Sequence, residues 1–329
     1  MCNECVRISY PVAVIVAISY HSLYKNARKI SALTFPFPAY MIDPSSEWRN
    51  AMKRFRKIYL EISNICNLKC AFCPGTKRPK RAMTEDEFRS LLPKLRPWTD
   101  YLYFHLMGEP LCHPRLYDFL ALAHETGFKV ILTTNGTGLL THGERLLNTS
   151  GLYKVNVSLH AFEANDLSMP FEEYLAGCCG FGVKAQGKVL VSYRLWNNGG
   201  ADQKNAQILT ALHQFFPGEW AQERKGIRIG QRIYLEHGDK FDWPDLSAPV
   251  QGEIVHCYGL RDHIGVLCDG TVVPCCLDHE GDIPLGNLHC QDLGEILDSP
   301  RSTAIFDGFQ TGNAPESLCR RCGYATRFQ

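Results

Sequence analysis

The sequence predicts an α/β fold, namely a partial (β/α)6 TIM-like barrel followed by a small C-terminal domain. From Lys57 onward, short β-branched or aromatic runs alternate with amphipathic segments, as is typical of βα units around a parallel sheet. After residues 242–245 (DWPD) this alternation ends, and the rest of the chain carries seven of its 15 cysteines. We therefore expect an N-terminal arm at 1–51, a barrel at 52–242 and a Cys-rich domain at 243–329.

Six segments have the near-continuous apolar character of strands that are covered on both faces. They are Lys57–Ile62, Tyr101–Leu106, Lys129–Thr134, Lys154–Leu159, Lys188–Leu195 and Ile227–Leu235. Helix signals lie between them, because capping residues, Pro or Gly stand beside apolar stripes. The expected helices start at Thr84, run over Leu116–Glu125, run from Pro170 to Leu175, and extend from Asp202 to Phe216. Six βα units of this kind predict an open barrel.

The Cys-rich C-terminal segment contains a clear hairpin signal. Ile264–Leu267 and Thr271–Pro274 flank a turn that contains Asp269 and Gly270, and Asp-Gly is a favoured hairpin turn. A short helix is expected at Leu293–Leu297. This segment is therefore predicted to fold as a second, smaller unit.

The first 51 residues differ from the rest of the chain. They hold Cys2 and Cys5, a short apolar run at Val12–Ile18 and a Pro-broken stretch. This offers too little apolar surface to offset the entropy of ordering the arm. We expect the arm to be disordered or not native, with Met52 as a candidate true start. The alternative is that Val12–Ile18 adds a strand or plugs the open side of the barrel.

The chain is almost electrically neutral, with 35 Lys and Arg against 34 Asp and Glu. This balance argues against a nucleic-acid partner. The apolar run at Val12–Ile18 is far shorter than the ~20 residues that cross a bilayer, and no small-residue cleavage site follows it. We therefore expect a cytoplasmic protein with no membrane partner, whose clustered cysteines hold metal in a reducing environment.

Directly after the first expected strand, the chain carries a C-x3-C-x2-C motif at Cys66, Cys70 and Cys73. Three thiolates on eight residues can converge on one metal site. A structural zinc site takes four ligands, usually from two C-x2-C pairs. Three thiolates with no nearby fourth ligand therefore indicate an open coordination position.

The motif and its place after a strand resemble those of the radical S-adenosylmethionine (SAM) enzymes, and the resemblance extends from Lys57 to about Leu235. It implies that Cys66, Cys70 and Cys73 bind three irons of a [4Fe–4S] cluster, while SAM chelates the fourth iron. In that family, an electron from the cluster cleaves SAM, and the resulting 5′-deoxyadenosyl radical abstracts hydrogen from an unreactive C–H bond. The protein supplies orientation and excludes water.

A segment after the second expected strand supports the resemblance. Residues 107–110 (MGEP) are similar to the family's GGEP segment, whose backbone and carboxylate hold the SAM amino group. Met stands where the family has its first Gly. The resemblance implies that Gly108 lets the backbone approach SAM closely and that Glu109 accepts from the ammonium.

Other cofactor-binding residues are expected at the ends of later strands, where barrel enzymes place their functional groups. By resemblance, Asn135 belongs to the SAM site, Ser158 contacts the SAM ribose and Arg194 contacts the SAM carboxylate. For all three residues, the alternative is a structural role without cofactor contact. Asn135 could form a turn, Ser158 could cap or pack, and Arg194 could form an ordinary ion pair.

A second set of cysteines occupies the C-terminal segment. Cys257, Gly270 and Cys275 have C-x12-G-x4-C spacing, and Cys319 and Cys322 form a later C-x2-C pair. This arrangement resembles the SPASM/twitch extension of radical SAM enzymes, which is an iron–sulfur domain. No cysteine follows the last pair, so we expect one auxiliary [4Fe–4S] cluster. Zinc is the alternative, because four thiolates also suit a tetrahedral site.

Some cysteines and charges have less certain roles. Cys276 could replace Cys275 as a ligand, although the G-x4-C spacing favours Cys275. The others are expected to be small buried hydrophobic residues, one of which could donate hydrogen to a substrate radical. They are Cys112, Cys178, Cys179, Cys268 and Cys290. The basic run at Lys77–Arg81 is expected to be a solvated face, with a docking patch for an acidic peptide or phosphorylated substrate as the alternative.

These features predict a radical SAM oxidoreductase or maturase, with a cluster-bound SAM and an auxiliary cluster as cofactors. The expected reaction oxidises or cross-links a peptide or protein, with an electron donor such as flavodoxin or ferredoxin. One alternative is a dehydrogenase of a small sugar or alcohol. An alternative of another class is a non-catalytic iron–sulfur or zinc binding module, for which Glu109 and Arg194 would have no use.

Overall fold

The computed structural model describes residues 55–252 and 254–328, which belong to one compact unit. The expected N-terminal arm, with Cys2, Cys5 and the candidate start Met52, lies outside the described residues. The boundary expected between 242 and 243 stays a prediction.

Six parallel strands stand side by side in the middle of the sheet, in the order expected for successive βα units. They are β1 (Lys57–Leu60), β2 (Tyr101–Tyr103), β3 (Lys129–Thr134), β4 (Leu152–Ser158), β5 (Leu190–Asn198) and β8 (Ile233–Asp239). The whole sheet has 11 strands, with β11 and β6 at its two edges, so it does not close on itself. The prediction of a partial barrel is confirmed.

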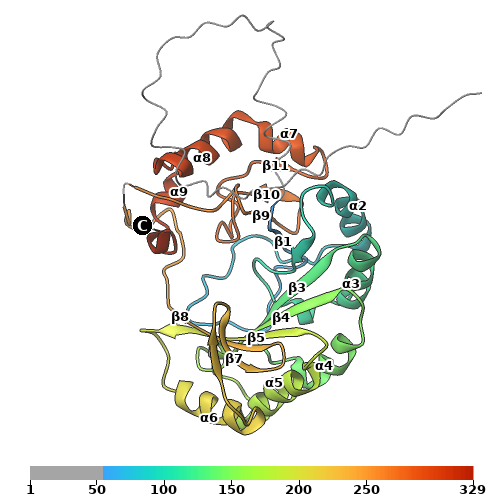
Figure 1. Cartoon of the computed structure of the whole chain (residues 1–329). Coiled ribbons are helices and arrows are strands. Elements are labelled where there is room, and N and C mark those ends of the chain that lie inside the picture. Colours follow the sequence, from blue (N-terminus) through green and yellow to red (C-terminus); the bar gives the residue numbers. More distant parts are fainter. Residues whose placement is uncertain (1–54, 253, 329) are drawn as a thin grey trace, which may run out of the picture. The chain divides into compact units, whose positions relative to one another are not determined.

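Helices connect the parallel strands and lie on the outer side of the sheet (Figure 1). They are α2 (Glu85–Leu95), α3 (Leu116–Glu125), α4 (Leu139–Leu147), α5 (Phe171–Ala185) and α6 (Asn205–Phe215), with short 3-10 turns η1 (Pro110–Cys112) and η2 (Leu159–Ala161). The capping box predicted at Thr84 is confirmed, since Thr84 and Glu87 each accept from the backbone amide of the other. Helix α4 was not predicted. No helix in the described part of the chain is long and apolar enough to span a membrane.

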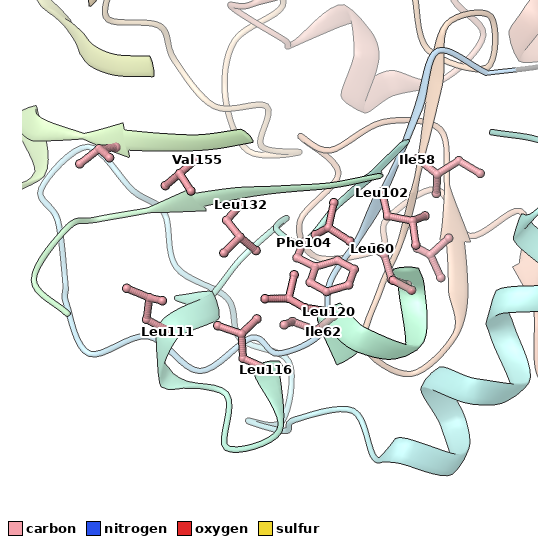
Figure 2. Packing of buried hydrophobic residues seen from close by; sticks show 14 of the residues in the cluster. Ile58, Leu60, Ile62, Leu102, Phe104, Leu111, Leu116, Leu120, Leu132 and Val155 are labelled. Atoms are coloured by element: carbon pink, nitrogen blue, oxygen red, sulfur yellow. The ribbon is translucent and has the colours of Figure 1, made fainter. Parts of the chain in front are cut away.

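The core lies between the strands and these helices. Alternate residues of β1 to β4 point outward and are almost fully buried, and in Figure 2 Leu60, Ile62 and Phe104 gather around Leu120 of α3. Burying side chains of this size contributes about 1.5–3 kcal/mol each. Because strand side chains alternate between faces, the intervening residues point into the barrel, where polar groups gather.

The prediction that Ile227–Leu235 forms one strand is wrong. It is a hairpin of β7 (Gly226–Gly230) and β8, which pair antiparallel, with β6 (Ala221–Glu223) on the far side of β7. The chain turns at Arg232, whose φ is 65°. Ile and Leu recur at alternate positions on both sides of this turn, so the apolar pattern alone does not reveal it.

The C-terminal unit continues the barrel sheet. The predicted hairpin is confirmed as β9 (His263–Val266) and β10 (Thr271–Val273), and Gly270 in its turn has φ 84°. Strand β9 pairs in parallel with β1, so residues about 200 positions apart become neighbours. The remaining elements are β11 (Gly286–Asn287), α7 (Leu293–Asp298), α8 (Pro300–Thr311), α9 (Ser317–Arg320) and η3 (Ala325–Phe328). Helix α7 was predicted, and α8 was not.

Candidate active site

The loop after β1 brings the three cysteines of the C-x3-C-x2-C motif to the wall of a large cavity. Each sulfur accepts a hydrogen bond. For Cys66 and Cys73 the donor is the backbone amide two residues further along, at 3.4 Å for Cys66, and Cys70 accepts from the side-chain amide of Asn165 at 3.1 Å. Such donors surround thiolates in iron–sulfur sites, where they tune the reduction potential.

The electrostatics of these thiols suit a metal cluster. Burial raises the pKa of all three, that of Cys66 to about 11, and the neighbouring thiols add to the shift at Cys66 and Cys70. A positively charged cluster would favour the thiolate forms. The three crowded thiols and their N–H donors therefore fit a cluster with three protein ligands.

Asn165 is a residue that the sequence analysis did not single out. Its Oδ1 accepts from the backbone amide of Lys69 at 3.0 Å, and its Nδ2 also donates to the carbonyl of Ala161 at 2.7 Å. It therefore anchors the cysteine loop to the segment after β4. Asn165 is 95 residues from Cys70, so no local pattern points to it.

The loop after β2 holds Glu109 below the cavity surface. Met107 and Gly108 line the cavity, whereas the Glu109 side chain is buried, with 3% exposed. Its carboxylate accepts from the backbone amides of Leu111 at 3.1 Å and Asn135 at 2.7 Å. No Lys or Arg forms an ion pair with it among the described residues, and burial raises its pKa to about 7. This buried carboxylate lacks a cation, which the ammonium of SAM would supply.

Gly108 is required where the β2 loop passes the β1 loop. Its φ is 82°, and a Cβ there would lie 2.2 Å from the carbonyl oxygen of Ser63. Only glycine tolerates this backbone conformation and approach. The expected close approach of the backbone at Gly108 is present.

Asn135 and Ser158 lie at the ends of β3 and β4. The side-chain amide of Asn135 donates to Asn67 in the cysteine loop at 2.9 Å, and Asn135 also accepts from Thr137, as in a turn. Ser158 lines the cavity and lies opposite Arg194 in the register of β4 and β5. Asn135 thus connects the β3 end to the cysteine loop, and Ser158 faces the ligand space.

Arg194 lines the same cavity and has a carboxylate partner. Its Nε lies 3.3 Å from Glu236 of β8, and its guanidinium lies 4.4 Å from the ring centre of Trp196. Glu236 also pairs with Lys154 at 3.3 Å. Burial acts to raise the pKa of Glu236, but Arg194 and Lys154 outweigh it and hold the pKa below its usual value. The ion pair that the sequence left open for Arg194 is therefore present.

The cavity has a volume of about 890 Å³ and is lined by the barrel and by the C-terminal unit. Besides the three cysteines, Gly108, Ser158 and Arg194 face it. The structure thus brings together residues from the ends of β1, β2 and β4, as the barrel prediction requires. Arg194 was expected at the end of its strand, but it lies in the middle of β5, which continues to Asn198.

The second cysteine set surrounds a small apolar cavity in the C-terminal unit. It is lined by Cys257, Cys275, Cys319 and Cys322, together with apolar side chains such as Phe309. Burial, followed by the neighbouring thiols of Cys276 and of the other three cysteines at this cavity, raises the pKa of Cys275 well above its usual value. Four thiols in apolar surroundings fit an auxiliary metal centre.

Cys276 points elsewhere. It lines the large cavity and forms a side-chain hydrogen bond with Tyr59, whereas Cys275 lines the small one. Of the cysteines expected to be buried, Cys178, Cys179 and Cys268 are buried, but Cys112 and Cys290 are exposed. The expectation was wrong for these last two, because they lie in a short 3-10 turn and in a loop rather than in the core.

The basic run Lys77–Arg81 is only partly a solvated face. Lys77 and Lys80 are exposed, and Lys80 donates to the carbonyl of Asn64 at 3.1 Å. Arg78 is largely buried in an ion pair with Glu61, so the expectation of a solvated face was wrong for this residue. The docking patch stays a prediction.

Among the described residues, no three His, Cys, Asp or Glu side chains converge closely enough to hold a single metal ion.

Two family models match the chain. Residues 60–176 match the radical SAM superfamily, and residues 257–323 match the SPASM iron–sulfur cluster-binding domain. These matches define the class, an iron–sulfur protein that uses SAM. The chain belongs to the radical SAM superfamily and carries a C-terminal SPASM domain, as the sequence predicts.

The matched domains also confirm the predicted kinds of cofactor. A radical SAM domain implies a [4Fe–4S] cluster and SAM, and a SPASM domain implies auxiliary iron–sulfur clusters. The number of auxiliary clusters and the ligand assignments stay predictions.

Relatives match different shares of the chain. The AdoMet-dependent heme synthase of Methanosarcina barkeri is 30% identical over 131 residues, which are 37% of this chain and 38% of the relative. The chain therefore matches well under half the length of that relative. The SAM-dependent 2-deoxy-scyllo-inosamine dehydrogenase of Niallia circulans is 21% identical over 82% of this chain and 93% of its own.

Two solved structures share the fold. BtrN in complex with AdoMet and 2-DOIA has a TM-score of 0.55 and 18% identity, over 82% of this chain and 93% of BtrN. Streptococcus suis SuiB has a TM-score of 0.57 and 14% identity, over 84% of this chain and 72% of SuiB. These likenesses show a common fold.

Proposed function

We propose that this protein is a radical SAM oxidoreductase that cleaves SAM reductively and removes hydrogen from a substrate held in the large cavity. The observation that carries the proposal is that Cys66, Cys70 and Cys73, each with an N–H donor, all line that cavity. When bound, the cluster and SAM supply the 5′-deoxyadenosyl radical that abstracts hydrogen.

The chain's own residues would bind and orient the cofactors. The three thiolates would hold the cluster. Glu109 would balance the SAM ammonium, Ser158 would contact the ribose, and Arg194, whose Nε pairs with Glu236, would contact the SAM carboxylate through its other guanidinium nitrogens. Asn135 positions the cysteine loop through Asn67, which supports its place in the SAM site.

Four further thiolates would hold one auxiliary [4Fe–4S] cluster. Cys257, Cys275, Cys319 and Cys322 surround one small cavity, and three of them also line the large one. The four thiols therefore lie beside the substrate space, and a cluster held by them would supply an acceptor for the electron that a substrate radical loses on oxidation. A structural zinc is the competing occupant.

The size of the cavity supports a small-molecule substrate. Small-molecule sites usually measure about 300–1,000 Å³, and SAM itself would fill part of the 890 Å³ here. The dehydrogenase of Niallia circulans, which this chain matches over 93% of its length, supports dehydrogenation of a small alcohol or sugar. The peptide or protein substrate expected from the sequence stays a prediction, as does the flavodoxin or ferredoxin donor.

The test is SAM cleavage by the anaerobically reconstituted protein. With dithionite and SAM, 5′-deoxyadenosine should form slowly even without substrate, and Cys70→Ala should abolish it. Cys290→Ala is the matched control, since Cys290 is exposed and lines neither of the two cavities. Near-zero iron with stoichiometric zinc would instead identify a non-catalytic module.

The substrate class can be tested in the same assay. A dialysable metabolite fraction and a peptide fraction of host cells are added separately, and the rate of 5′-deoxyadenosine formation is measured by mass spectrometry. Stimulation by the metabolite fraction alone is the expected result. Stimulation by the peptide fraction alone would restore the peptide assignment.

A further inference from the structure

A group of basic and aromatic side chains lines the cavity on the inner face of β1, β2 and β9, and we call it the Tyr59 pocket. The Tyr59 ring centre lies 5.1 Å from that of Tyr103, and His105 and His263 meet Tyr59 edge-on at 5.3 and 5.6 Å. The ammonium of Lys57 lies 4.9 Å from the centres of both tyrosine rings. All five side chains face the cavity.

Lys57 has no acidic partner at ion-pair distance among the described residues. The acidic groups that influence it are the thiol of Cys276 and, more weakly, Asp262, which pairs with Arg56 at 3.5 Å and with Arg261 at 2.9 Å. Burial lowers the pKa of Lys57, and the positive charge of Arg194 lowers it further. A partly buried ammonium between phenol rings is thus held without a counter-ion.

The two histidines of the pocket are neutral at physiological pH. Burial, followed by the charges of Arg194 and Lys57, lowers the pKa of His105 to about 3, and burial and Lys57 lower that of His263 to about 4. The Nδ1 atom of His105 is buried and has no hydrogen-bond partner among the described residues. The pocket therefore offers a cation and an unsatisfied imidazole together.

The rest of the cavity wall is also positively charged. The Lys and Arg side chains that line it are Arg56, Lys57, Lys69, Lys80, Arg194 and Lys240. Among the described lining residues, Asp262 is the one Asp or Glu that faces them. Such a wall attracts an anion.

We propose that Lys57 and His105 bind an oxyanion of the substrate, a carboxylate or a phosphate ester, so that the substrate is an organic anion seated against Tyr59 and Tyr103. The inference rests on the proposed function, because it names the substrate class of that cavity. The oxyanion would supply the counter-charge that Lys57 lacks and accept a hydrogen bond from His105. The flat phenol rings beside it would pack against the carbon part of the substrate.

The contact between an ammonium and two tyrosines does not by itself require a ligand. Lys129 makes the same contact with Tyr101 and Tyr153, at 5.5 and 5.6 Å, but it is exposed and lies outside the cavity. Lys129 therefore provides a matched control for Lys57.

The test measures anion binding to the reconstituted holoenzyme without reductant. Thermal unfolding is followed with inorganic phosphate or benzoate added, at constant ionic strength against chloride. One of the two anions should raise the unfolding temperature of the wild type and of Lys129→Gln. Lys57→Gln should weaken that anion at least tenfold, and Lys57→Arg should restore part of the binding. The anion that acts distinguishes a phosphate site from a carboxylate site.

A second measurement needs no variant. In the wild-type holoenzyme, the effective anion should slow acylation of Lys57 by acetic anhydride, as read by mass spectrometry, and leave Lys129 unchanged. The proposal is overturned if neither anion stabilises beyond chloride, if Lys57→Gln binds as tightly as the wild type, or if Lys57 is acylated equally with and without anion. Because no reductant is present, these outcomes are independent of SAM cleavage, whose loss would instead overturn the proposed function.

Discussion

Arg78 and Glu61 form a buried, bidentate ion pair between the cysteine loop and the end of β1. The two guanidinium nitrogens of Arg78 donate to the two carboxylate oxygens of Glu61 at 2.9 and 2.6 Å, and the side chains are 14% and 0% exposed. Glu61 also accepts from the backbone amides of Met107 and Cys268, and Arg78 Nε donates to the carbonyl of His279. One ion pair therefore ties together the cysteine loop, the β2 loop and the C-terminal unit.

Arg78→Met should destabilise the protein strongly, because it leaves the Glu61 carboxylate buried without a cation. Breaking one side of a buried pair costs about 3–5 kcal/mol. The free energy of unfolding is measured by anaerobic urea denaturation. Arg89→Met is the control, since Arg89 pairs with Glu85 on the surface of α2 and should lose less than about 1 kcal/mol. Equal losses in the two variants would show that the buried pair has no special structural role.

Single replacements of Cys275 and Cys276 should show which of these adjacent cysteines binds the auxiliary cluster. The reconstituted protein should bind ~8 irons, in two four-iron clusters. Cys275→Ala should remove about half of them, because its thiol faces the small cavity with three others. Cys276→Ala should keep the full iron content, since that thiol contacts Tyr59. Iron loss in Cys276→Ala alone would reverse the assignment.

Binding of SAM should depend on pH through Glu109. Burial raises the pKa of this carboxyl to about 7, so it ionises and can pair with the SAM ammonium only as the pH rises through that value. The dissociation constant, measured by calorimetry without reductant, should therefore fall between about pH 6 and pH 8. Glu109→Gln should weaken binding at the upper pH by about 1.5–3 kcal/mol and remove this dependence.

The same carboxyl should affect stability with the opposite sign when SAM is absent. Between its ordinary pKa and about 7, the folded protein keeps a proton that the unfolded chain loses, so stability should fall as the pH rises through this window. Glu109→Gln should flatten the decline. An unchanged pH profile and unchanged SAM affinity in this variant would contradict the assignment of the β2 loop.

Asn165→Leu should make the cluster of the cysteine loop harder to reduce. The variant removes the N–H donor to Cys70, and fewer donors at a cluster sulfur leave more negative charge on it and lower its potential. A redox titration followed by electron paramagnetic resonance measures the shift. Asn198→Leu, at an exposed site on β5, is the control and should leave the potential unchanged. A wild-type potential in Asn165→Leu would refute the tuning role.

Structural features that depend on nearby residues could be predicted from the sequence. The capping box at Thr84, the end of α3 at Glu125 and the hairpin turn at Gly270 each depend on residues within a few positions, and all three are present. The spacing of Cys66, Cys70 and Cys73 likewise predicted that they share one site. The apolar pattern did not predict the turn at Arg232, because the alternation of apolar residues continues on both sides of it.

Features that depend on distant pairing were decided only by the tertiary structure. The parallel pairing of β9 with β1 brings His263 beside Lys57 and forms the Tyr59 pocket. The sequence allowed either Cys275 or Cys276 at the auxiliary site, and the bend that follows β10 directs Cys275 to the small cavity. The basic character of residues 77–81 was evident in the sequence, but the burial of Arg78 depends on Glu61. Sequence patterns report the local preferences of the backbone, whereas counter-charges and cavities arise where segments far apart in the chain meet.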